Sequence, residues 1–289
     1  MEKFLTFLLI VFSAFEAYAA IYTDSHPLSK EVLFNKEVII AAKKDSAAYS
    51  GPAELFYPDG QVKMSADFIG GRANGSVMGY YPDGTLHYIM HCYKGKPNGI
   101  VRIYNQDGAL EYEFNFNHGA AEGQAKKYYF DSVLQAEAQY KDNNIDGFMI
   151  TYDRNGNIES KIPYTKGIIQ GTAVQYFDNG SVFSELEYID GKAEGILKTY
   201  FANGKLASTA EFKNNAIEGH AKIYEQDSDS YIDLICKNNI IEEGYFIDGE
   251  GKRKALRKSQ INKCRKNLAL ERYLEKPDFF VFCENSGKF

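Results

Sequence analysis

Apolar and polar residues alternate in short runs along most of this chain. Runs such as SVMGYY at residues 76–81 and LHYIMHCY at residues 86–93 are rich in β-branched and aromatic residues, which favour strands. The runs are separated by Pro-Asp-Gly, Asp-Asn-Gly or Ala-Asn-Gly, residues that form tight turns with positive φ. The pattern therefore predicts β-hairpins and an all-β fold.

A glycine recurs every 24 residues from Gly51 to Gly219, and Gly244 follows one residue late. This period defines eight units, in which the glycine is position 1, and we expect each to be one hairpin. The predicted fold is an elongated single-layer antiparallel β-meander of eight hairpin repeats with a short C-terminal α-helical cap. The units are 51–74, 75–98, 99–122, 123–146, 147–170, 171–194, 195–218 and 219–243.

Several positions within the unit keep their residue type. Position 6 is always aromatic and is assigned to the core, position 10 is Gly except for Ser132 and Ser228, and position 18 is aromatic or Cys. A second, longer connection to the next hairpin ends in an acid or amide before the glycine. Strand alternation predicts that positions 12, 14, 16 and 18 share one face, with Leu86, Tyr88, Met90 and Cys92 as the example.

This unit, with YYPDG followed by an aliphatic residue, an aromatic residue and a GK..G segment, resembles the bacterial variant of the MORN repeat. The resemblance covers residues 51–243 and implies an elongated, twisted antiparallel sheet with no catalytic residues of its own. Some relatives are described as antitoxin-like, and other MORN proteins are linked to lipid or protein scaffolding. Ser132, Ser228 and the cysteines at position 18 depart from the pattern, which affects local turns rather than the architecture.

Position 7 is the candidate partner-binding position. It neighbours the aromatic residue at position 6 and is expected to point to the opposite face. A row of aromatic residues there would form a platform for a protein, a glycan or a partner strand; cross-strand stacking that only stabilises a thin sheet is the alternative. The candidates are Tyr57, Tyr81, Tyr129, Phe177 and Phe201.

The N-terminal residues 1–20 have the layout of a secretory signal peptide. A lysine near the start is followed by an apolar run and by the small-residue pattern Ala17-Tyr18-Ala19, so we expect cleavage near Ala19 or Ala20. The protein is then exported, to the periplasm or the exterior. Residues 21–50 are predicted to supply N-terminal capping strands.

The C-terminal residues 244–289 are predicted to form a cap with a basic helix. Residues 252–276 hold ten Lys or Arg against two Glu, a net charge of +8, whereas the whole chain carries −6. Ile261, Cys264 and Leu268 lie on one helical stripe, which indicates packing on the last hairpin. Docking on an anionic lipid or another acidic surface is the alternative.

Cysteine usage fits an oxidising compartment. Cys264 and Cys283 flank the predicted helix and an apolar run, and a disulfide between them would fix the cap. Cys92 and Cys236 lie six repeats apart, too far to bond each other, and are interpreted as core residues. A disulfide from Cys236 to a cap cysteine stays open.

Catalytic and metal-binding patterns are weak. The five histidines are scattered, no Cys-x-x-Cys occurs, and no nucleophile motif is present. We therefore predict no enzyme activity, no cofactor and no metal. The expected function is an exported non-catalytic repeat scaffold for a protein or an envelope component, with an antitoxin-like or immunity-like inhibitor and an anionic-lipid-binding protein as alternatives. Nucleic acid is not an expected partner, since the chain is acidic overall.

Overall fold

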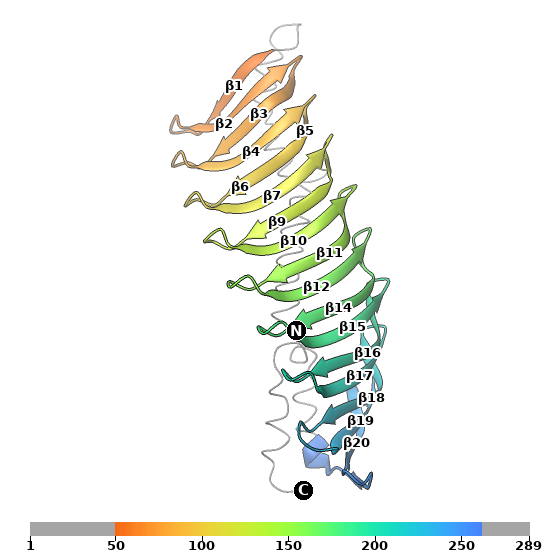
Figure 1. The fold of residues 1–289 in the computed structure, drawn as a ribbon. Helices are drawn as coiled ribbons and strands as arrows, with labels where there is room; N and C mark the ends of the chain where they lie inside the picture. Colours follow the sequence, from red (N-terminus) through yellow and green to blue (C-terminus); the bar gives the residue numbers. More distant parts are fainter. Residues whose placement is uncertain (1–49, 262–289) are drawn as a thin grey trace. The chain divides into compact units, whose positions relative to one another are not determined.

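The computed structural model describes residues 50–261 (Figure 1). Within this range the chain divides into two compact units, residues 50–156 and residues 157–261, which are described separately. The predicted signal peptide, the capping strands before residue 50, the disulfide between Cys264 and Cys283, and the part of the basic segment beyond residue 261 lie outside the described residues.

The first unit is an open antiparallel sheet in which the strands follow chain order. Each long strand pairs with the long strands before and after it in the chain, so that β4 pairs with β6 and β7 with β9. The short strand β5 pairs with β4, and the short strand β8 pairs with β7. Its strands are β1 (Gly51–Phe56), β2 (Val62–Ile69), β3 (Arg72–Tyr80), β4 (Leu86–Tyr93), β5 (Lys96–Pro97), β6 (Gly99–Tyr104), β7 (Leu110–Asn117), β8 (Ala120–Ala121), β9 (Gly123–Tyr128), β10 (Leu134–Lys141) and β11 (Asn144–Tyr152).

The second unit repeats this arrangement and ends in a helical turn at residues 258–261. Strand β13 pairs with β12, and the remaining strands again pair in chain order. The predicted antiparallel meander with a short C-terminal helix is confirmed. Its strands are β12 (Ile158–Thr165), β13 (Ile168–Ile169), β14 (Gly171–Tyr176), β15 (Val182–Ile189), β16 (Lys192–Tyr200), β17 (Leu206–Lys213), β18 (Ala216–Tyr224), β19 (Tyr231–Lys237), β20 (Ile240–Ile247) and β21 (Arg253–Ala255).

The turn inside each repeat has the geometry that Pro-Asp-Gly favours. The Gly60 N–H donates to the Tyr57 carbonyl at 2.9 Å, and the Tyr57 N–H donates to the Gln61 carbonyl at 2.7 Å. The Asp59 carboxylate accepts a hydrogen bond from the Gln61 N–H at 3.0 Å, which closes the turn further. Position 10 has positive φ in the first seven repeats, and this explains why glycine is so frequent there.

The connection between repeats is a two-residue turn at positions 20 and 21. Both residues have positive φ, as Asn214 at 49° and Asn215 at 68° show, which is the type I′ geometry that matches strand twist. The prediction of a longer connection is wrong, because the residues after the turn rejoin the sheet. Lys96 and Pro97, for example, form β5.

Exchanging the residues at two equivalent turns should change stability in opposite directions. Ser132 holds φ at 63°, and Gly156 holds it at 84° with no atom near an added Cβ. The left-handed conformation costs a residue with a Cβ about 1–2 kcal/mol, partly offset by the greater unfolded-state entropy of glycine. Ser132→Gly should therefore raise the free energy of unfolding by about 0.5 kcal/mol, and Gly156→Ser should lower it by about 1 kcal/mol. Equilibrium denaturation of the two variants measures both, and equal signs would contradict the assignment.

The acid or amide at position 24 links each repeat to the next. Its side chain accepts a hydrogen bond from the backbone N–H at position 20 of the following repeat, as between Glu194 and Asn214 at 2.9 Å and between Asn98 and His118 at 3.1 Å. This contact satisfies a backbone donor that the type I′ turn leaves unpaired. The same bond is made by Ser50, Asn74, Glu122, Gln170 and Glu218.

Position 1 has positive φ in all eight repeats, which favours glycine, and at Gly75 a close neighbour adds a second reason. Gly75 has φ at 124°, and a Cβ there would lie 3.2 Å from the Cβ of Asp67 on the neighbouring strand. A side chain would therefore meet both backbone strain and a close neighbour. This local need accounts for the 24-residue glycine period that defines the repeats.

The side chains divide between two faces. The inner face holds positions 3, 5, 14, 16 and 18, which are mostly buried, and the outer face holds positions 2, 4, 6, 12, 15 and 17. In the third repeat the inner face contains Val101, Ile103 and Phe114, which are 0%, 3% and 1% exposed. Directly paired residues on neighbouring strands share a face, so the assignment follows from the register.

A β-bulge in the hairpins of repeats one to four, six and seven sets which residues reach the inner face, as β3 and β4 illustrate. Gly79 pairs with Tyr88, but the next residue, Tyr80, pairs with Leu86, so that His87 is an extra residue in β4. Such a bulge reverses the alternation along its strand. Leu86 therefore lies on the outer face beside Tyr80.

Two face predictions are wrong for this reason. Leu86 does not share a face with Met90 and Cys92, which are buried on the inner face at 1% and 0% exposure. The aromatic residue at position 6 is not the core residue either, because position 5 is the buried one in β3, where Gly79 is buried and Tyr80 is half-buried. Position 18 does lie in the core, as expected.

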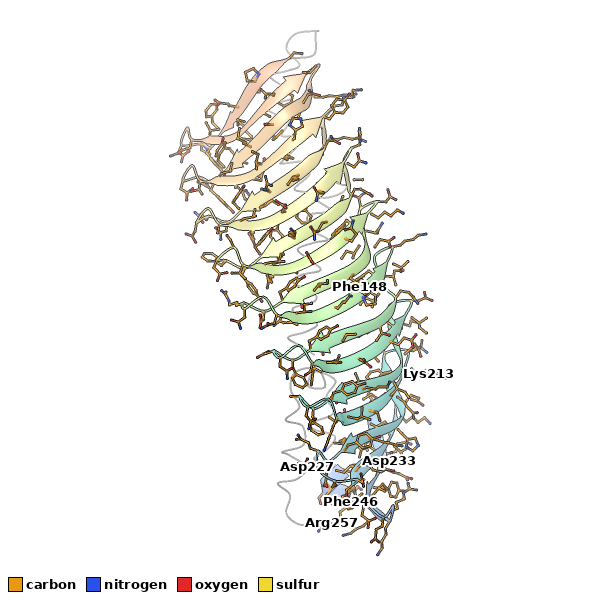
Figure 2. The ribbon with its side chains drawn as sticks, viewed as in Figure 1. Phe148, Lys213, Asp227, Asp233, Phe246 and Arg257 are labelled. Atoms are coloured by element: carbon orange, nitrogen blue, oxygen red, sulfur yellow. The ribbon has the colours of Figure 1, made fainter. Side chains whose placement is uncertain are left out.

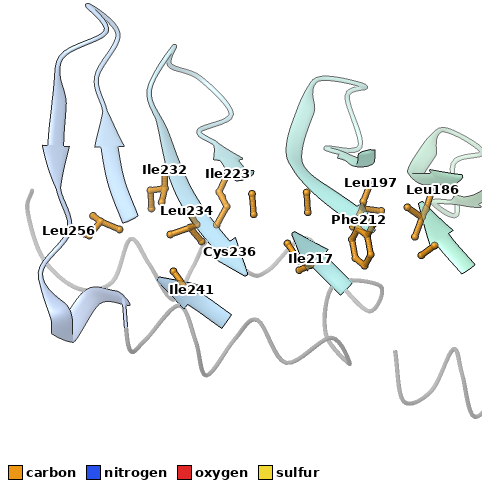
Figure 3. Packing of buried hydrophobic residues seen from close by; sticks show 13 residues of the cluster. Leu186, Leu197, Phe212, Ile217, Ile223, Ile232, Leu234, Cys236, Ile241 and Leu256 are labelled. Carbon is orange, nitrogen blue, oxygen red and sulfur yellow. The ribbon is translucent and has the colours of Figure 1, made fainter. Parts of the chain in front are cut away.

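The inner face of the second unit forms a continuous apolar cluster (Figure 3). Its members come from successive strands, which is the nearest-neighbour arrangement expected of a repeat array. Tyr188, Phe246 and Ile261 pack against it. The buried members are Leu186, Ala193, Leu197, Ala210, Phe212, Ile217, Ala221, Ile223, Ile232, Leu234, Cys236, Ile241 and Leu256.

Candidate interaction surface

A row of aromatic and aliphatic side chains crosses the strands on the outer face; we call it the tyrosine–aliphatic row. It consists of positions 6 and 12, which are directly paired in the hairpins of repeats one to four, six and seven and therefore lie side by side there. In the first unit the pairs are Phe56 with Val62, Tyr80 with Leu86, Tyr104 with Leu110, and Tyr128 with Leu134, and Tyr152 extends the row. In the second unit they are Tyr176 with Val182 and Tyr200 with Leu206.

Two tyrosines of this row, Tyr152 and Tyr200, direct their hydroxyls back to the sheet. The Tyr152 hydroxyl donates to the Glu137 carboxylate at 2.8 Å, on the neighbouring strand. In the second unit the Tyr200 hydroxyl makes the same bond to Glu185 at 3.1 Å. Each ring is half-buried, so part of its surface faces solvent.

The hydroxyl of Tyr152 should lose its proton at a higher pH than the hydroxyl of a solvent-exposed tyrosine. Burial, which has the largest effect, together with the hydrogen bond to the Glu137 carboxylate and the charge of that carboxylate, raises its pKa to about 12. Glu137→Gln should lower the pKa of Tyr152 only part of the way toward 10, since burial remains. Tyrosine-selective carbon NMR across an alkaline titration measures this, and an unchanged pKa would contradict the role of the carboxylate.

The raised pKa of Tyr152 also predicts that the folded state loses stability at alkaline pH. The folded chain keeps the Tyr152 proton longer than the unfolded chain, whose tyrosine titrates near 10. The contribution of this group is therefore complete below pH 10 and is lost as the pH rises toward about 12. Wild type should accordingly lose more stability than Glu137→Gln over that interval.

Charged residues flank the row on the same face. Arg102 and Glu113 are directly paired across β6 and β7 and form an ion pair at 2.7 Å. Lys126 and Glu137 are directly paired across β9 and β10. The flank thus offers donors and acceptors of both charge signs next to an apolar centre.

The residues predicted at position 7 lie elsewhere. Alternation places them on the inner side of the turn, where they contact the bulge residue at position 13, as Tyr81 does with His87 at 4.3 Å between ring centroids. The Tyr81 hydroxyl donates to the Tyr104 carbonyl at 3.0 Å. Tyr57 and Tyr129 make the same bond to Tyr80 and Tyr152 of the next repeat at 2.7 and 2.8 Å.

The two phenylalanines at position 7 are also half-buried. Phe177 packs edge-on against Phe183 at 5.1 Å between ring centroids, and Phe201 donates its N–H to the Lys205 carbonyl in the turn. The five candidates therefore occupy equivalent positions, three of them in the first unit and two in the second. Each of the three tyrosine hydroxyls donates to a backbone carbonyl of the next repeat. Sequence reasoning missed position 6 as a surface position; the turn glycine that accompanies the bulge was the signal.

The C-terminal end of the described chain covers the last hairpin. A Cβ on Gly244 would lie within 3.5 Å of Leu256, Leu234 and Ile261, so these side chains close over the glycine. Ile261 thus packs on the final hairpin, in agreement with the helical stripe in the sequence. The basic segment also contributes to the sheet, since Arg253 lies in β21 with its guanidinium 3.4 Å from the Tyr245 ring centroid.

Cys92 and Cys236 are free thiols on the inner face. Burial raises the pKa of each to about 11, so both stay protonated and unreactive near neutral pH. Between residues 50 and 261, no three His, Cys, Asp or Glu side chains gather closely enough to hold a metal ion. Over the same range no helix has the length and apolar character needed to cross a membrane.

Four consecutive segments match the family model described as MORN repeat variant, at residues 121–142, 146–166, 169–190 and 193–214. Residues 121–214 are therefore similar to four tandem MORN repeats. Each match ends at the first residue of a type I′ turn, so a MORN repeat here is one strand, its turn and the following strand. No curated protein matches this sequence.

Solved structures give only distant similarities. A complex of TcdB2, TccC3 and Cdc42 is 12% identical with a TM-score of 0.19, and the match covers 71% of this chain and 15% of that one. A Photorhabdus luminescens Tc holotoxin pore is 13% identical with a TM-score of 0.20, over 68% of this chain and 12% of that one. This chain spans less than a sixth of either.

Proposed function

We propose that this protein is an exported, non-catalytic scaffold that binds another protein or an envelope component along the outer face of its MORN-repeat sheets. The observation that carries the proposal is the tyrosine–aliphatic row, an apolar strip that recurs in the same register in hairpin after hairpin. Export rests on the layout of residues 1–20 alone.

Accessible apolar side chains beside the row support a binding role. Ile100 and Phe148 at position 2 are 43% and 46% exposed, and Phe56 in the row itself is 52% exposed; Phe148 is marked in Figure 2. A sheet face that needed only to stay in water would carry polar residues at such positions. A surface with an apolar centre and a charged flank has the composition of a binding interface.

Two substitutions on the outer face test this function. Ile100→Lys with Phe148→Lys should reduce capture of the bound component at least about tenfold, since replacing an apolar contact residue that a partner covers with lysine costs more than 1.4 kcal/mol. Both side chains are exposed, so the fold should be unaffected. The measurement compares, by quantitative mass spectrometry, what wild type and variant retain from a solubilised envelope fraction.

Ile69→Lys is the matched control, because Ile69 is 61% exposed at the type I′ turn edge and lies outside the row and its flank. A component retained equally by wild type and the double variant would contradict the proposal. So would equal loss in the double variant and in Ile69→Lys.

Binding to anionic lipid is a second candidate, favoured by the exposed basic residues Arg253, Lys254, Arg257 and Lys258. Vesicles containing a third phosphatidylserine should then sediment the protein at low salt and release it as the ionic strength rises. Equal sedimentation with pure phosphatidylcholine would exclude this candidate.

A further inference from the structure

The tyrosines of the outer face recur at a fixed distance. Each repeat contributes two paired strands, and strands lie about 4.8 Å apart, so successive tyrosines are separated by about 10 Å. In residues 50–156 the sheet pairing holds four of them in line. These are Tyr80, Tyr104, Tyr128 and Tyr152.

The rings of Tyr80 and Tyr152 each turn one flat side toward solvent. The hydroxyl of Tyr152 is tied to Glu137 on the adjacent strand, and that of Tyr80 contacts the Met78 sulfur at 3.6 Å on its own strand. A tyrosine whose tip touches the sheet has its ring laid along the surface. Its π face is then the part available to a ligand, bordered by the aliphatic residue at position 12.

We propose that the tyrosine–aliphatic row of residues 50–156 binds an extended β-1,4-linked glycan lying across the strands. In such a chain every second sugar turns the same way, and the length of one disaccharide matches the interval between tyrosines. The apolar C–H face of a pyranose ring stacks on an aromatic ring. The proposal rests on the proposed function, which makes the outer face the binding surface.

The flank of the row supplies the polar contacts that a sugar needs. Arg102, Glu113, Lys126 and Glu137 lie on the same face as the tyrosines, and together they offer donors and acceptors to hydroxyl groups along the edge of the glycan. A protein strand fits less well, because the row lies on the face of the sheet, where the backbone groups are already paired.

The test uses the full chain with defined sugars. Chitohexaose and cellohexaose are titrated into wild type by calorimetry, and binding to insoluble chitin, cellulose and peptidoglycan sacculi is measured by sedimentation. Tyr104→Leu and Tyr128→Leu keep an apolar side chain and remove the flat ring. Each should weaken binding about tenfold, and the two together by more.

Tyr93→Leu is the matched control, since Tyr93 is 44% exposed but lies at position 19, outside the row. Unchanged affinity in this variant supports the proposal, and thermal melts of all variants show whether the fold is kept. Absence of saturable binding by wild type to every sugar overturns the glycan proposal. So does equal affinity in wild type and in the double leucine variant.

The outcomes also separate this inference from the broader function. If no sugar binds while the double leucine variant loses an envelope protein that wild type retains, the glycan is wrong and the scaffold function stands. If substitutions in the row and on its flank change nothing that the protein retains, both proposals fall.

Discussion

Replacing Phe114 with alanine is expected to lower the free energy of unfolding of the first unit by about 3–5 kcal/mol. Phe114 is 1% exposed, and its ring centroid lies 6.1 to 6.5 Å from those of Tyr112, Phe116 and Tyr140. Alanine would leave a cavity at the centre of this aromatic group. Since each repeat contacts mainly its neighbours, the loss should be concentrated in β6–β10.

Denaturant titration combined with hydrogen exchange measures both the size and the place of this effect. Amide protection should fall most in β7 and its neighbours β6 and β9. Phe130→Ala serves as the control, because Phe130 is 66% exposed in a turn and its loss should change stability by less than about 0.5 kcal/mol. A uniform loss of protection over all described strands would contradict nearest-neighbour stability.

Gly79→Ala is expected to cost about 3 kcal/mol, an unusually large effect for the addition of one methyl group. A Cβ at Gly79 would overlap the ring of Tyr88, which lies directly opposite on β4. The ring covers the glycine, and an alanine would force this half-buried ring to move.

A double-mutant cycle identifies the cause. In a Tyr88→Ala background the obstructing ring is gone, so adding Gly79→Ala should cost less than about 1 kcal/mol. Gly249→Ala is the control, since its nearest neighbour, the Asp229 Cβ, lies at 3.8 Å and its φ is not in the left-handed region. Equal costs of Gly79→Ala in both backgrounds would show that the ring is not responsible.

The fold could be predicted because the decisive signals are local. The 24-residue glycine period reflects a backbone requirement at residues such as Gly75, and the Asp-Gly turns fix where each strand ends. These signals need no knowledge of distant contacts. They therefore predict hairpins, their order and their count directly.

The faces could not be predicted, because one extra residue per hairpin changes every assignment beyond it. The turn glycine Gly84 is consistent with a bulge, but only the pairing of Tyr80 with Leu86 shows that His87 is the extra residue. The prediction of the candidate site was wrong for the same reason. Tyr81 was expected on the open face and instead bonds the next repeat, whereas Tyr80, expected in the core, lies on the outer face.

The hydrogen bond between the side chain at position 24 and the backbone N–H at position 20 of the next repeat has the same form at successive junctions, so one repeat could follow another without a new kind of contact. If residues 99–122 were excised, Asn98 would precede Gly123 and its amide would meet the Asp142 N–H in place of that of His118. The new junction would contain the same donor, the same class of acceptor and the same glycine. The outer face can therefore be lengthened or shortened by whole repeats through duplication or deletion of 72 nucleotides.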